Sequence, residues 1–472
     1  MRRAIWWLRR DLRLVDNSAL QAALDAGEEV IPLFIRDPFF ERSRFYSEKR
    51  ATFHYGGLES LDNDLRQRGG RLIVRSGKPA EVLKQVMEES GAEAIFAKAD
   101  HSPYARRRDE SVGSQLPLEL VGSTSLRSPD EVLKGDGEPY IVYTPFMRRW
   151  KELPLPGPSE ILPAPERINT PDEIQSEALP EAKGGQTLIF PPSEQEAQRR
   201  LEKFIQGNEA SIYMYDELRN RMDVDGTSQL SPYLRFGMLS ARQAVVAALK
   251  ARDKAGNSGE ARRGAETWLN ELIWREFYIS ILYHYPHVLK GSFREKYDSL
   301  RWRNDEEDFA AWRKGRTGYP VVDAAMRQLA TTGWMHNRAR MIAASFLVKN
   351  LLIDWRWGEE WFMQHLVDGD PANNNGGWQW TAGTGTDAAP YFRVFNPILQ
   401  SKKFDPDGFY IRRWVPELVQ VRDKYIHTPW EMPVEVQREA NCEIGKEYPR
   451  PIVDVKVSRQ MALDAYAAVK KK

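Results

Sequence analysis

The first 130 residues alternate short aliphatic or aromatic runs with longer amphipathic stretches, and this alternation restricts the fold more than any other feature. The runs are AIWWL at 4–8, EVIPLFI at 29–35, RLIVRSG at 71–77 and AEAIFA at 92–97. Apolar residues at helical spacing lie between them, over 47–68 and again over 80–89. Strands that alternate with helices predict a parallel sheet with crossover helices.

No GxGxxG motif follows the first run, so the usual dinucleotide-binding signature is missing. An open α/β sheet without that motif can still bind a chromophore at the carboxyl ends of its strands. The sequence therefore predicts the sheet more firmly than it predicts a ligand for it.

A change of pattern divides the rest of the chain. Residues 151–192 hold nine of the 29 prolines and no sustained periodicity, as in a connector between domains. From about residue 194 onward, helical periods dominate. We expect an α/β domain over 1–130, a proline-rich connector over 131–193 and a helical domain over 194–472.

Composition excludes several classes of protein. The 472 residues carry 68 Lys and Arg against 67 Asp and Glu, a net charge of +1, so a nucleic-acid surface must be a local patch. The single Cys442 excludes an internal disulfide or a multi-cysteine metal site, and we expect no bound metal. No window resembles a membrane span or a secretory signal, so we expect an intracellular, cytoplasmic protein that binds no membrane.

Ten of the 15 tryptophans lie between residues 268 and 380. Core filling accounts for many tryptophans, but here Asn, Glu and Arg are interleaved with them, as in pockets that stack planar rings and bind their edges. Residues 262–349 also carry fifteen Lys or Arg against ten Asp or Glu, an excess of +5. A solvated helix surface would show the same charge, yet aromatic residues beside the basic ones favour nucleic acid.

Two predicted helices present polar stripes. On a helix over 266–282, Glu271, Trp274, Arg275 and Tyr278 fall at i, i+3, i+4 and i+7, which places them on one face. On a helix over 334–352, the same spacing relates Asn337, Arg340, Met341 and Ala344. Such a face can bind a flat ligand or pack on another helix. Asn337 and Arg340 need polar partners if they are buried.

Two further segments have the composition of ligand-binding turns. DGDPANNNGGWQW at 368–380 is predicted to be a turn-rich loop; pairing of Asp368 with a buried arginine is favoured over a cation site, because no calcium-loop spacing is present. In GTSQLSPYLRFG at 226–237, hydroxyls and backbone N–H groups before a helix suit a pyrophosphate, although a simple helix cap is equally compatible.

Long motifs run through nearly the whole chain. They are RRDLRLVDN (9–17), WLNELIWREFY, TGYPVVDAAMRQL, TGWMHNRARM, LIDWRWGE, DGDPANNNGGWQW and YFRVFNP (391–397). These motifs resemble the photolyase/cryptochrome family, and within it the bacterial class I photolyases that repair cyclobutane pyrimidine dimers. The resemblance implies an α/β antenna domain with a five-stranded, Rossmann-like parallel sheet and an all-α domain that binds FAD.

Several positions match those at which the family binds the flavin: Tyr215, Thr227, Ser228, Gln229, Leu230, Ser231, Trp268, Arg340, Asp368, Gly369, Asp370 and Asn374. Asn374 matches the position that faces flavin N5, where photolyases have Asn, plant cryptochromes Asp and animal cryptochromes Cys. A neutral amide there hydrogen-bonds N5 without adding charge. The resemblance therefore favours DNA repair over signalling.

Other positions match substrate contacts and an electron relay. Trp274 and Trp380 correspond to the pair that sandwiches the flipped dimer, and Glu271, Asn337 and Met341 to its edge contacts. The remaining matches are the DNA-backbone contacts Arg219, Arg338 and Gln400 and the relay Trp378, Trp355 and Trp302. Glu271, Asn374, Trp274 and Trp380 thus form the implied catalytic set, in which light-excited reduced FAD gives an electron to the flipped dimer. Met341 replaces the His of 6-4 photolyases.

The resemblance leaves the antenna chromophore open. Folate-binding relatives carry Asn-Glu where this chain has Tyr104-Ala105, and PYARRRD resembles the PYGRxRD of deazaflavin-binding relatives. We expect 8-hydroxy-deazaflavin, with FMN or methenyltetrahydrofolate as alternatives, near Arg10, Phe34 and Asp37. A monomer that acts on dimer-containing DNA without a protein partner is expected. A cryptochrome photoreceptor, a 6-4 photolyase and a light-independent nucleic-acid-binding module are the other readings.

Overall fold

The computed structural model describes residues 2–180, 189–207 and 210–470, and it divides the chain into two compact units. Unit 1 comprises Met1–Asp216, Ser228–Pro286 and Val367–Ala372; unit 2 comprises Glu217–Thr227, His287–Leu366 and Asn373–Lys472. Both units therefore take segments from distant parts of the chain. The linear division into 1–130, 131–193 and 194–472 stays a prediction.

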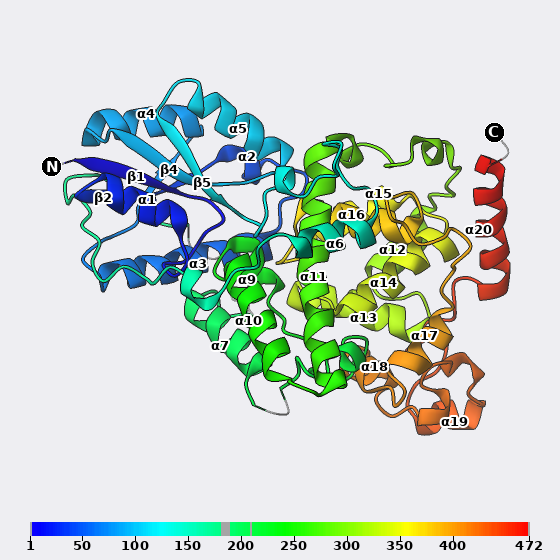
Figure 1. Ribbon diagram of the computed structural model, residues 1–472. Helices are drawn as coiled ribbons and strands as arrows, with labels where there is room; N and C mark the ends of the chain where they lie inside the picture. Colours follow the sequence, from blue (N-terminus) through cyan, green and yellow to red (C-terminus); the bar gives the residue numbers. More distant parts are fainter. Residues whose placement is uncertain (1, 181–188, 208–209, 471–472) are drawn as a thin grey trace. The chain divides into compact units, whose positions relative to one another are not determined.

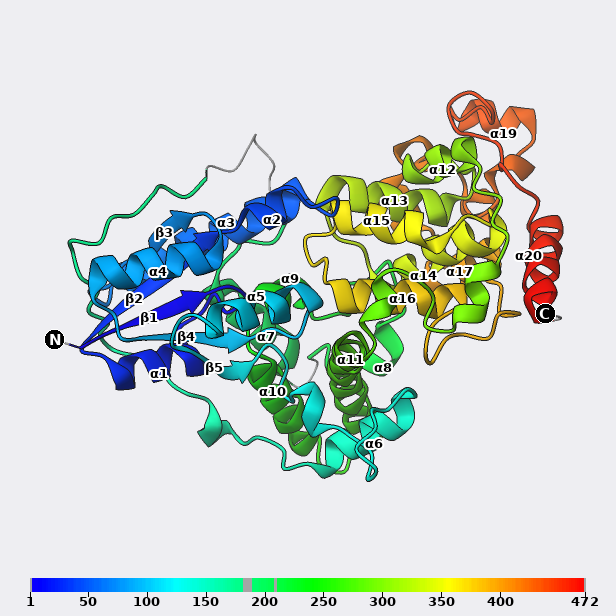
Figure 2. The same ribbon diagram turned by 90° about the horizontal axis from the view of Figure 1, so that it is seen from above.

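A five-stranded parallel sheet forms the amino-terminal part of unit 1 (Figure 1; Figure 2 also labels β3). Its strands are β1 (Arg3–Leu8), β2 (Glu29–Arg36), β3 (Ile73–Ser76), β4 (Ala94–Ala99) and β5 (Leu118–Ser123), in the spatial order β3-β2-β1-β4-β5. The register of the central strand pairs Ile5 with Ile31 on one side and with Ile95 on the other. The predicted α/β fold class is confirmed.

Helices cover both faces of this sheet. They are α1 (Ser18–Ala26), α3 (Glu48–Arg66), α4 (Pro79–Ser90) and α5 (Pro103–Gly113). Figure 1 shows α4 and α5 over one face and α1 and α3 over the other, as right-handed crossovers from a central β1 require. Ile5 and Trp7 share one core cluster with Val82 and Val86 of α4. Burial on both faces explains why β1 and β2 are almost continuously apolar.

Further helices of unit 1 lie outside the sheet region. They are α2 (Pro38–Glu41), α6 (Tyr143–Glu152), α7 (Glu194–Ile205), α9 (Ser231–Phe236), α10 (Ala241–Lys254) and the long α11 (Gly259–His284), while the short α8 (Tyr215–Leu218) crosses from unit 1 into unit 2. The Ser258 side chain caps α11 by accepting a hydrogen bond from the Ala261 N–H at 3.4 Å. α11 contains the predicted helix over 266–282.

Unit 2 is built from helices around a second core. The helices are α12 (Glu306–Arg313), α13 (Pro320–Thr332), α14 (Asn337–Ser345), α15 (Trp355–His365), α16 (Pro371–Ala382), α17 (Pro397–Phe404), α18 (Phe409–Trp414), α19 (Val434–Glu439) and α20 (Val455–Lys470). The first two residues of α16 belong to unit 1. A π-helical turn, η5 (Phe346–Asn350), continues α14. Short 3-10 turns in the two units are η1 (Pro129–Glu131), η2 (Pro158–Glu160), η3 (Pro286–Leu289), η4 (Glu295–Ser299), η6 (Pro416–Leu418), η7 (Asp423–Tyr425) and η8 (Pro429–Glu431). The predicted all-α second part is confirmed.

One local prediction was wrong. The segment 368–380 is not a turn-rich loop, because most of it forms α16 from Pro371 onward. The Asp370 carboxylate accepts a hydrogen bond from the Ala372 N–H at 3.1 Å, and Pro371 occupies the first helical turn, where a missing N–H costs nothing. The cap and the proline outweigh the low helix propensity of the three asparagines and two glycines that follow.

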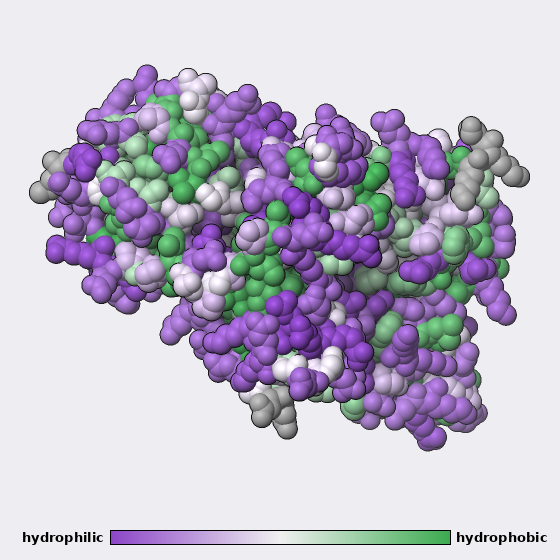
Figure 3. Space-filling model, viewed as in Figure 1, coloured by the Kyte–Doolittle hydropathy of each residue, from purple (hydrophilic) through white to green (hydrophobic). Residues whose placement is uncertain are grey.

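Polar and charged residues cover most of each unit on the face drawn in Figure 3. Among the described helices, none combines the length and the apolar composition that a membrane-spanning helix needs.

Candidate functional site

The candidate site residues are distributed over both units. Unit 1 holds Tyr215, Ser228, Gln229, Leu230, Ser231, Trp268, Glu271, Trp274, Asp368, Gly369 and Asp370. Unit 2 holds Arg219, Thr227, Trp302, Asn337, Arg338, Arg340, Met341, Trp355, Asn374, Trp378, Trp380 and Gln400.

The predicted stripe on α11 is half-buried as a whole. Glu271, Trp274, Arg275 and Tyr278 are each partly exposed, whereas Ile273 and Phe277 on the other side of the helix are buried. The Trp274 indole stacks on the Tyr143 ring of α6, with centroids 3.6 Å apart and planes 7° from parallel. Trp274 is therefore held flat by a partner that lies far away in the sequence.

Buried polar contacts fix the orientation of α11 at the next turn. The Arg275 guanidinium donates to the Thr124 and Leu234 carbonyl oxygens. The Glu276 carboxylate accepts from the Trp150 indole N–H at 2.6 Å and from the Leu126 N–H. Burial raises the pKa of Glu276, while these donors favour its charged form. Sequence analysis missed Glu276, because its partners lie more than a hundred residues away.

In unit 1, the candidate flavin residues Ser231, Asp368, Gly369 and Asp370 belong to one hydrogen-bonded group. The Ser231 hydroxyl donates to the Asp368 carboxylate at 2.6 Å. The Arg235 Nε donates to the Gly369 carbonyl oxygen at 2.8 Å, and the Arg10 Nη2 donates to Asp370 at 2.9 Å. These contacts bring together the two segments that sequence analysis selected separately.

The ion pair with arginine in this group belongs to Asp370. Arg10 bridges Asp370 and Asp100, and Arg235 lies 3.8 Å from Asp370. Burial lowers the pKa of Arg50 to about 10, and the negative charge of Asp368 acts against that shift. Asp368 thus lies within electrostatic reach of Arg50 and is bound directly by Ser231, while a direct ion pair of Asp368 with a buried arginine stays a prediction.

Tyr215 and Trp268 both contact the ring of one phenylalanine. Phe204 of α7 contacts the Tyr215 ring at 5.9 Å edge-on and the Trp268 ring at 5.1 Å. Phe204 therefore links two candidate flavin contacts that sequence analysis placed on separate elements.

The chemistry of these residues fits FAD. The Thr227 and Ser228 side chains are half-buried, so their hydroxyls can donate to the anionic oxygens of a pyrophosphate. Ser231 is exposed, but its hydroxyl proton is donated to Asp368 and would have to leave that carboxylate to reach a phosphate oxygen. Asn374 is half-buried and supplies a neutral amide for a ring nitrogen. These hydroxyl and amide groups are the donors that suit the pyrophosphate and the ring of FAD.

The Asn374 amide is held within unit 2 by the backbone of α15. Its Nδ2 donates to the Glu359 carbonyl oxygen at 3.0 Å. The neighbouring Asn375 donates both to the Glu359 carboxylate at 3.0 Å and to the Val288 carbonyl oxygen at 2.9 Å. These bonds fix α16 against α15 and set which way the Asn374 side chain points.

The predicted stripe on α14 is also partly exposed. Asn337 is exposed and Arg340 and Met341 are half-buried, while Ala339 and Ile342 on the opposite side are buried. Three members of the predicted stripe are therefore at least partly exposed, whereas the fourth, Ala344, is buried.

Arg338 on the same helix is oriented by unit 2 itself. Its guanidinium donates to the Asn220 side chain at 2.6 Å and lies 4.3 Å above the Phe404 ring of α17, the helix that also carries Gln400. Burial lowers the pKa of Arg338 to about 10, and repulsion by Arg219 adds to the shift. Arg219 and Arg338 therefore form a small basic cluster.

The three candidate relay tryptophans lie in or against the core of unit 2. Trp355 and Trp378 are 1% and 2% exposed members of one core cluster, and the partly exposed Trp302 packs against it. The Trp378 indole N–H is buried and has no hydrogen-bond partner among the described residues. Two of the three indole rings, Trp355 and Trp378, are therefore buried, and the third, Trp302, is partly exposed.

The candidate antenna residues do not form a single group of contacts. The Tyr104 hydroxyl donates to the Asp37 carboxylate, and the Tyr104 ring stacks on Phe39 with centroids 3.8 Å apart. Phe34 is buried edge-on against His54. The Arg10 side chain instead bonds Asp100 and Asp370, so it does not join the group around Tyr104.

No group of three or more His, Cys, Asp or Glu side chains in the described part of the chain could hold a metal ion.

Comparison with known proteins assigns the family. The model for "DNA photolyase" matches residues 4–166, and the model for "FAD binding domain of DNA photolyase" matches residues 268–468. The deoxyribodipyrimidine photo-lyase of Synechococcus is 42% identical over 95% of this chain and 93% of its own length, and that of Agrobacterium fabrum is 40% identical over 99% and 98%. The solved class III photolyase of Agrobacterium tumefaciens superposes with a TM-score of 0.92 at 38% identity, covering 100% of this chain and 98% of that one. The chain therefore belongs to the DNA photolyase family, a family of FAD-binding lyases of DNA repair.

Proposed function

We propose that this protein repairs cyclobutane pyrimidine dimers by light-dependent electron transfer to a dimer flipped out of DNA. The single observation that carries the proposal is the neutral Asn374 amide, which the Glu359 carbonyl holds in place from one side. A neutral amide facing flavin N5 is the feature that separates repair enzymes from plant and animal cryptochromes in this family. When bound, reduced FAD supplies a light-excited one-electron donor.

FAD binding is assigned to accessible hydroxyls and to the bonded group around Asp368. Thr227 and Ser228 would donate to the pyrophosphate, with Gln229 and Leu230 contributing backbone. Ser231 would join them on releasing the Asp368 carboxylate. Tyr215, Trp268, Arg340, Gly369 and Asp370 complete the proposed flavin contacts.

The proposed substrate contacts supply stacking and edge recognition. Trp274, held flat on Tyr143, and Trp380 stack on the dimer, while Glu271, Asn337 and Met341 bind its edges. A damaged step stacks and pairs poorly, so extrusion of a dimer costs less than extrusion of normal bases. That difference supplies part of the selectivity.

We assign Trp378, Trp355 and Trp302 to an electron relay that reduces oxidised flavin from the surface. Their burial supports this assignment, since two of the rings lie in the core and the third is partly exposed. Arg219, Arg338 and Gln400 are assigned to the DNA backbone. The basic cluster of Arg219 and Arg338 supports this role, because two adjacent cations favour a phosphate.

For the antenna, 8-hydroxy-deazaflavin remains the proposed chromophore, with FMN and methenyltetrahydrofolate as alternatives. A solved photolyase of Sulfolobus tokodaii, which superposes with a TM-score of 0.83 at 32% identity, holds two FAD molecules. The absorption spectrum of chromophores released from the purified protein distinguishes these compounds. The class I assignment likewise stays a proposal, since the similar Agrobacterium structure is of class III.

The decisive experiment is repair of a thymine-dimer oligonucleotide by purified, reduced protein under blue light, with a dark control. We expect a light-dependent return of thymine absorbance and no repair of a matched oligonucleotide with a 6-4 lesion. Repair of the 6-4 lesion alone would show that the assignment of Met341 is wrong. Photoreduction of FAD without repair of either lesion would favour the photoreceptor reading, since a Synechocystis cryptochrome is also similar at 29% identity.

Variants of Glu271 test how the substrate edge is bound. A hydrogen bond to the dimer needs only a donor at this position, so Glu271→Gln is expected to repair dimers at neutral pH at nearly the rate of the natural protein. Glu271→Ala is expected to lose about tenfold or more, which corresponds to one hydrogen bond to a charged or polarised group. The control is Glu260→Gln, an exposed glutamate in the first turn of the same helix. Equal loss in the Gln and Ala variants would contradict the hydrogen-bonding role.

A further inference from the structure

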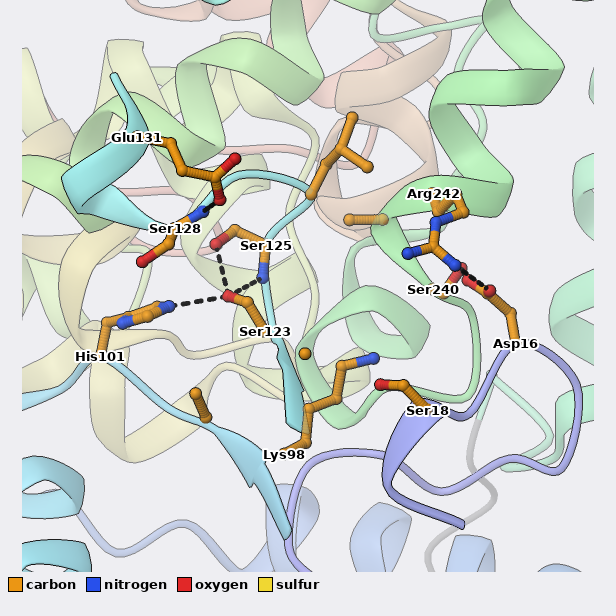
Figure 4. A pocket seen from close by; sticks show the side chains of 14 residues that line it. Asp16, Ser18, Lys98, His101, Ser123, Ser125, Ser128, Glu131, Ser240 and Arg242 are labelled. Atoms are coloured by element: carbon orange, nitrogen blue, oxygen red, sulfur yellow. Dashed lines mark hydrogen bonds and ion pairs between the residues drawn. The ribbon is translucent and has the colours of Figure 1, made fainter. Parts of the chain in front are cut away.

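A cavity of about 250 Å³ lies within unit 1 at the carboxyl ends of β4 and β5 (Figure 4). It is separate from the residues proposed above for flavin, substrate and antenna. Its walls come from the segment after β1, the ends of β4 and β5, the η1 turn and the start of α10. Most of its lining side chains are polar, and no Phe, Tyr or Trp is among the described residues that line it.

The Lys98 side chain enters this cavity without a protein partner. In Figure 4 it extends toward Ser18, from the end of β4. Among the described residues, none accepts a hydrogen bond from its ammonium group or forms an ion pair with it. Burial lowers the pKa of Lys98 to about 7; the charges of Arg13 and Arg242 act in the same direction, and those of Asp11 and Asp16 oppose them. A cation in this position is incompletely compensated by the protein.

The two carboxylates that line the cavity are already engaged. Asp16 accepts from the Arg242 guanidinium at 2.8 Å and from the Ser240 hydroxyl at 2.5 Å. Glu131 accepts from the Ser128 N–H at 2.7 Å, closing the capping box of η1. Neither carboxylate therefore supplies a dedicated counter-charge for Lys98.

Two helices begin at the cavity wall. α1 begins at Ser18 and α10 at Ala241. In each helix, the side chain of the N-cap residue, Asn17 or Ser240, accepts a hydrogen bond from the third backbone amide of the helix. Among the described residues, none accepts a hydrogen bond from the first two amides of α10, those of Ala241 and Arg242. Helix N-termini carry partial positive charge and bind anions, and here two of them flank an incompletely compensated ammonium group.

We infer that this cavity binds the phosphate group of a small ligand. Lys98 would supply the ionic contact, and the amides at the start of α10 and the Ser128 hydroxyl would donate hydrogen bonds to the phosphate oxygens. The volume lies below the roughly 300–1,000 Å³ of pockets for drug-sized ligands, and no aromatic ring is available for stacking. Both features favour inorganic phosphate or a small phosphomonoester over a nucleotide or a second chromophore.

Equilibrium dialysis of the FAD-loaded, full-length protein against radiolabelled inorganic phosphate, at constant ionic strength, tests this inference. We expect one saturable site in the natural protein and binding at least about tenfold weaker in Lys98→Gln, because a charge-assisted contact is lost. The matched control is Lys84→Gln, since Lys84 lies in the same unit with its side chain 68% exposed. Phosphate sites elsewhere are common to all three proteins. Equal binding by Lys98→Gln and the natural protein would overturn the inference.

A second measurement needs no variant. Phosphate bound beside Lys98 must raise the pKa of its ammonium group, which NMR of isotopically labelled lysine side chains follows directly; we expect a rise of about one unit or more. An unchanged Lys98 resonance would overturn the inference even if dialysis detected binding. A comparison of inorganic phosphate with glycerol phosphate identifies the source of the group. Succinate that binds as tightly as either would overturn the assignment to phosphate.

Discussion

Lys349 is the most thoroughly buried lysine in the core of unit 2. Its side chain is 1% exposed, donates to the Ala382 and Tyr391 carbonyl oxygens at 3.3 and 3.2 Å, and lies 3.9 Å from the centre of the Tyr466 ring. Burial lowers the pKa of Lys349 to about 7, and none of these partners carries a full negative charge. The folded protein therefore releases this proton at a pH about three units lower than the unfolded chain does.

The sign of the resulting pH dependence follows from linkage. Between about pH 7 and 10, the unfolded chain binds the Lys349 proton and the folded protein does not, so stability rises with pH in that window. Lys349→Met abolishes this contribution. We subtract the free energy of unfolding of Lys349→Met from that of the natural protein, each measured by denaturant titration. This difference should rise with pH, by up to about 1.4 kcal/mol per pH unit.

The control for this prediction is Lys314→Met, because Lys314 is an exposed lysine of the same unit. Its difference from the natural protein should stay flat over the same pH range. A flat difference for Lys349→Met as well would show that this ammonium is solvated or paired in the folded protein.

Residue identities were predicted from the sequence better than residue partners were. The half-buried Trp274 lies on the predicted stripe, but its partner Tyr143 lies on a different helix. Asn374 was singled out, whereas Glu359, whose carbonyl holds it, was not. Spacing along one helix shows which side chains share a face, but contacts between elements depend on packing that no local pattern encodes.

At the scale of elements, periodicity predicted the long helices and missed the irregular segments. The polar stripes on α11 and α14 lie on the helices for which the spacing predicted them, because a 3.6-residue period is a strong signal over three or more turns. β5 (Leu118–Ser123) was not located, since its burial pattern is mostly exposed and half-buried, as for a strand at the edge of the sheet. α16 was missed because the cap at Asp370 is a single-residue signal.

The end of α9 provides a test of how tightly the elements of unit 1 fit together. Gly237 ends this helix at φ +68°, and a Cβ there would lie 2.0 Å from the Arg10 carbonyl oxygen. Gly91 ends α4 at φ +67°, but a Cβ there meets nothing within 4 Å. The two glycines therefore share the left-handed conformation and differ in the available space.

Substitution of each glycine by alanine separates the cost of the left-handed conformation from the cost of the steric clash. Gly91→Ala is expected to lose about 1 kcal/mol of stability from the left-handed conformation alone. Gly237→Ala should lose a further 1–3 kcal/mol or so, because the backbone around Arg10 must shift. Urea denaturation followed by circular dichroism measures both. Similar losses in the two variants would mean that the loop carrying Arg10 yields easily, and it would weaken the view that the Arg10–Asp370 pair is rigidly placed.

At the scale of the whole molecule, the near-zero net charge limits how DNA can be bound. A net charge of +1 over 472 residues provides no general attraction to a polyanion, so binding depends on local basic groups such as Arg219 and Arg338. Asn220 and Phe404 hold the Arg338 guanidinium in a fixed orientation before DNA arrives. A prearranged cation loses less conformational freedom on binding than a mobile one does.

Arg338→Gln should therefore weaken binding to dimer-containing and undamaged DNA by a similar factor, since a phosphate contact is blind to the bases. Each phosphate contact contributes about 0.9 to the slope of log affinity against log salt concentration, so the slope should fall by about one. Fluorescence anisotropy over a series of salt concentrations measures it. Arg422→Gln, which removes an exposed arginine paired with Glu439, should leave the slope unchanged. If Arg338→Gln keeps the natural slope but loses preference for the dimer, then Arg338 recognises the lesion rather than the backbone.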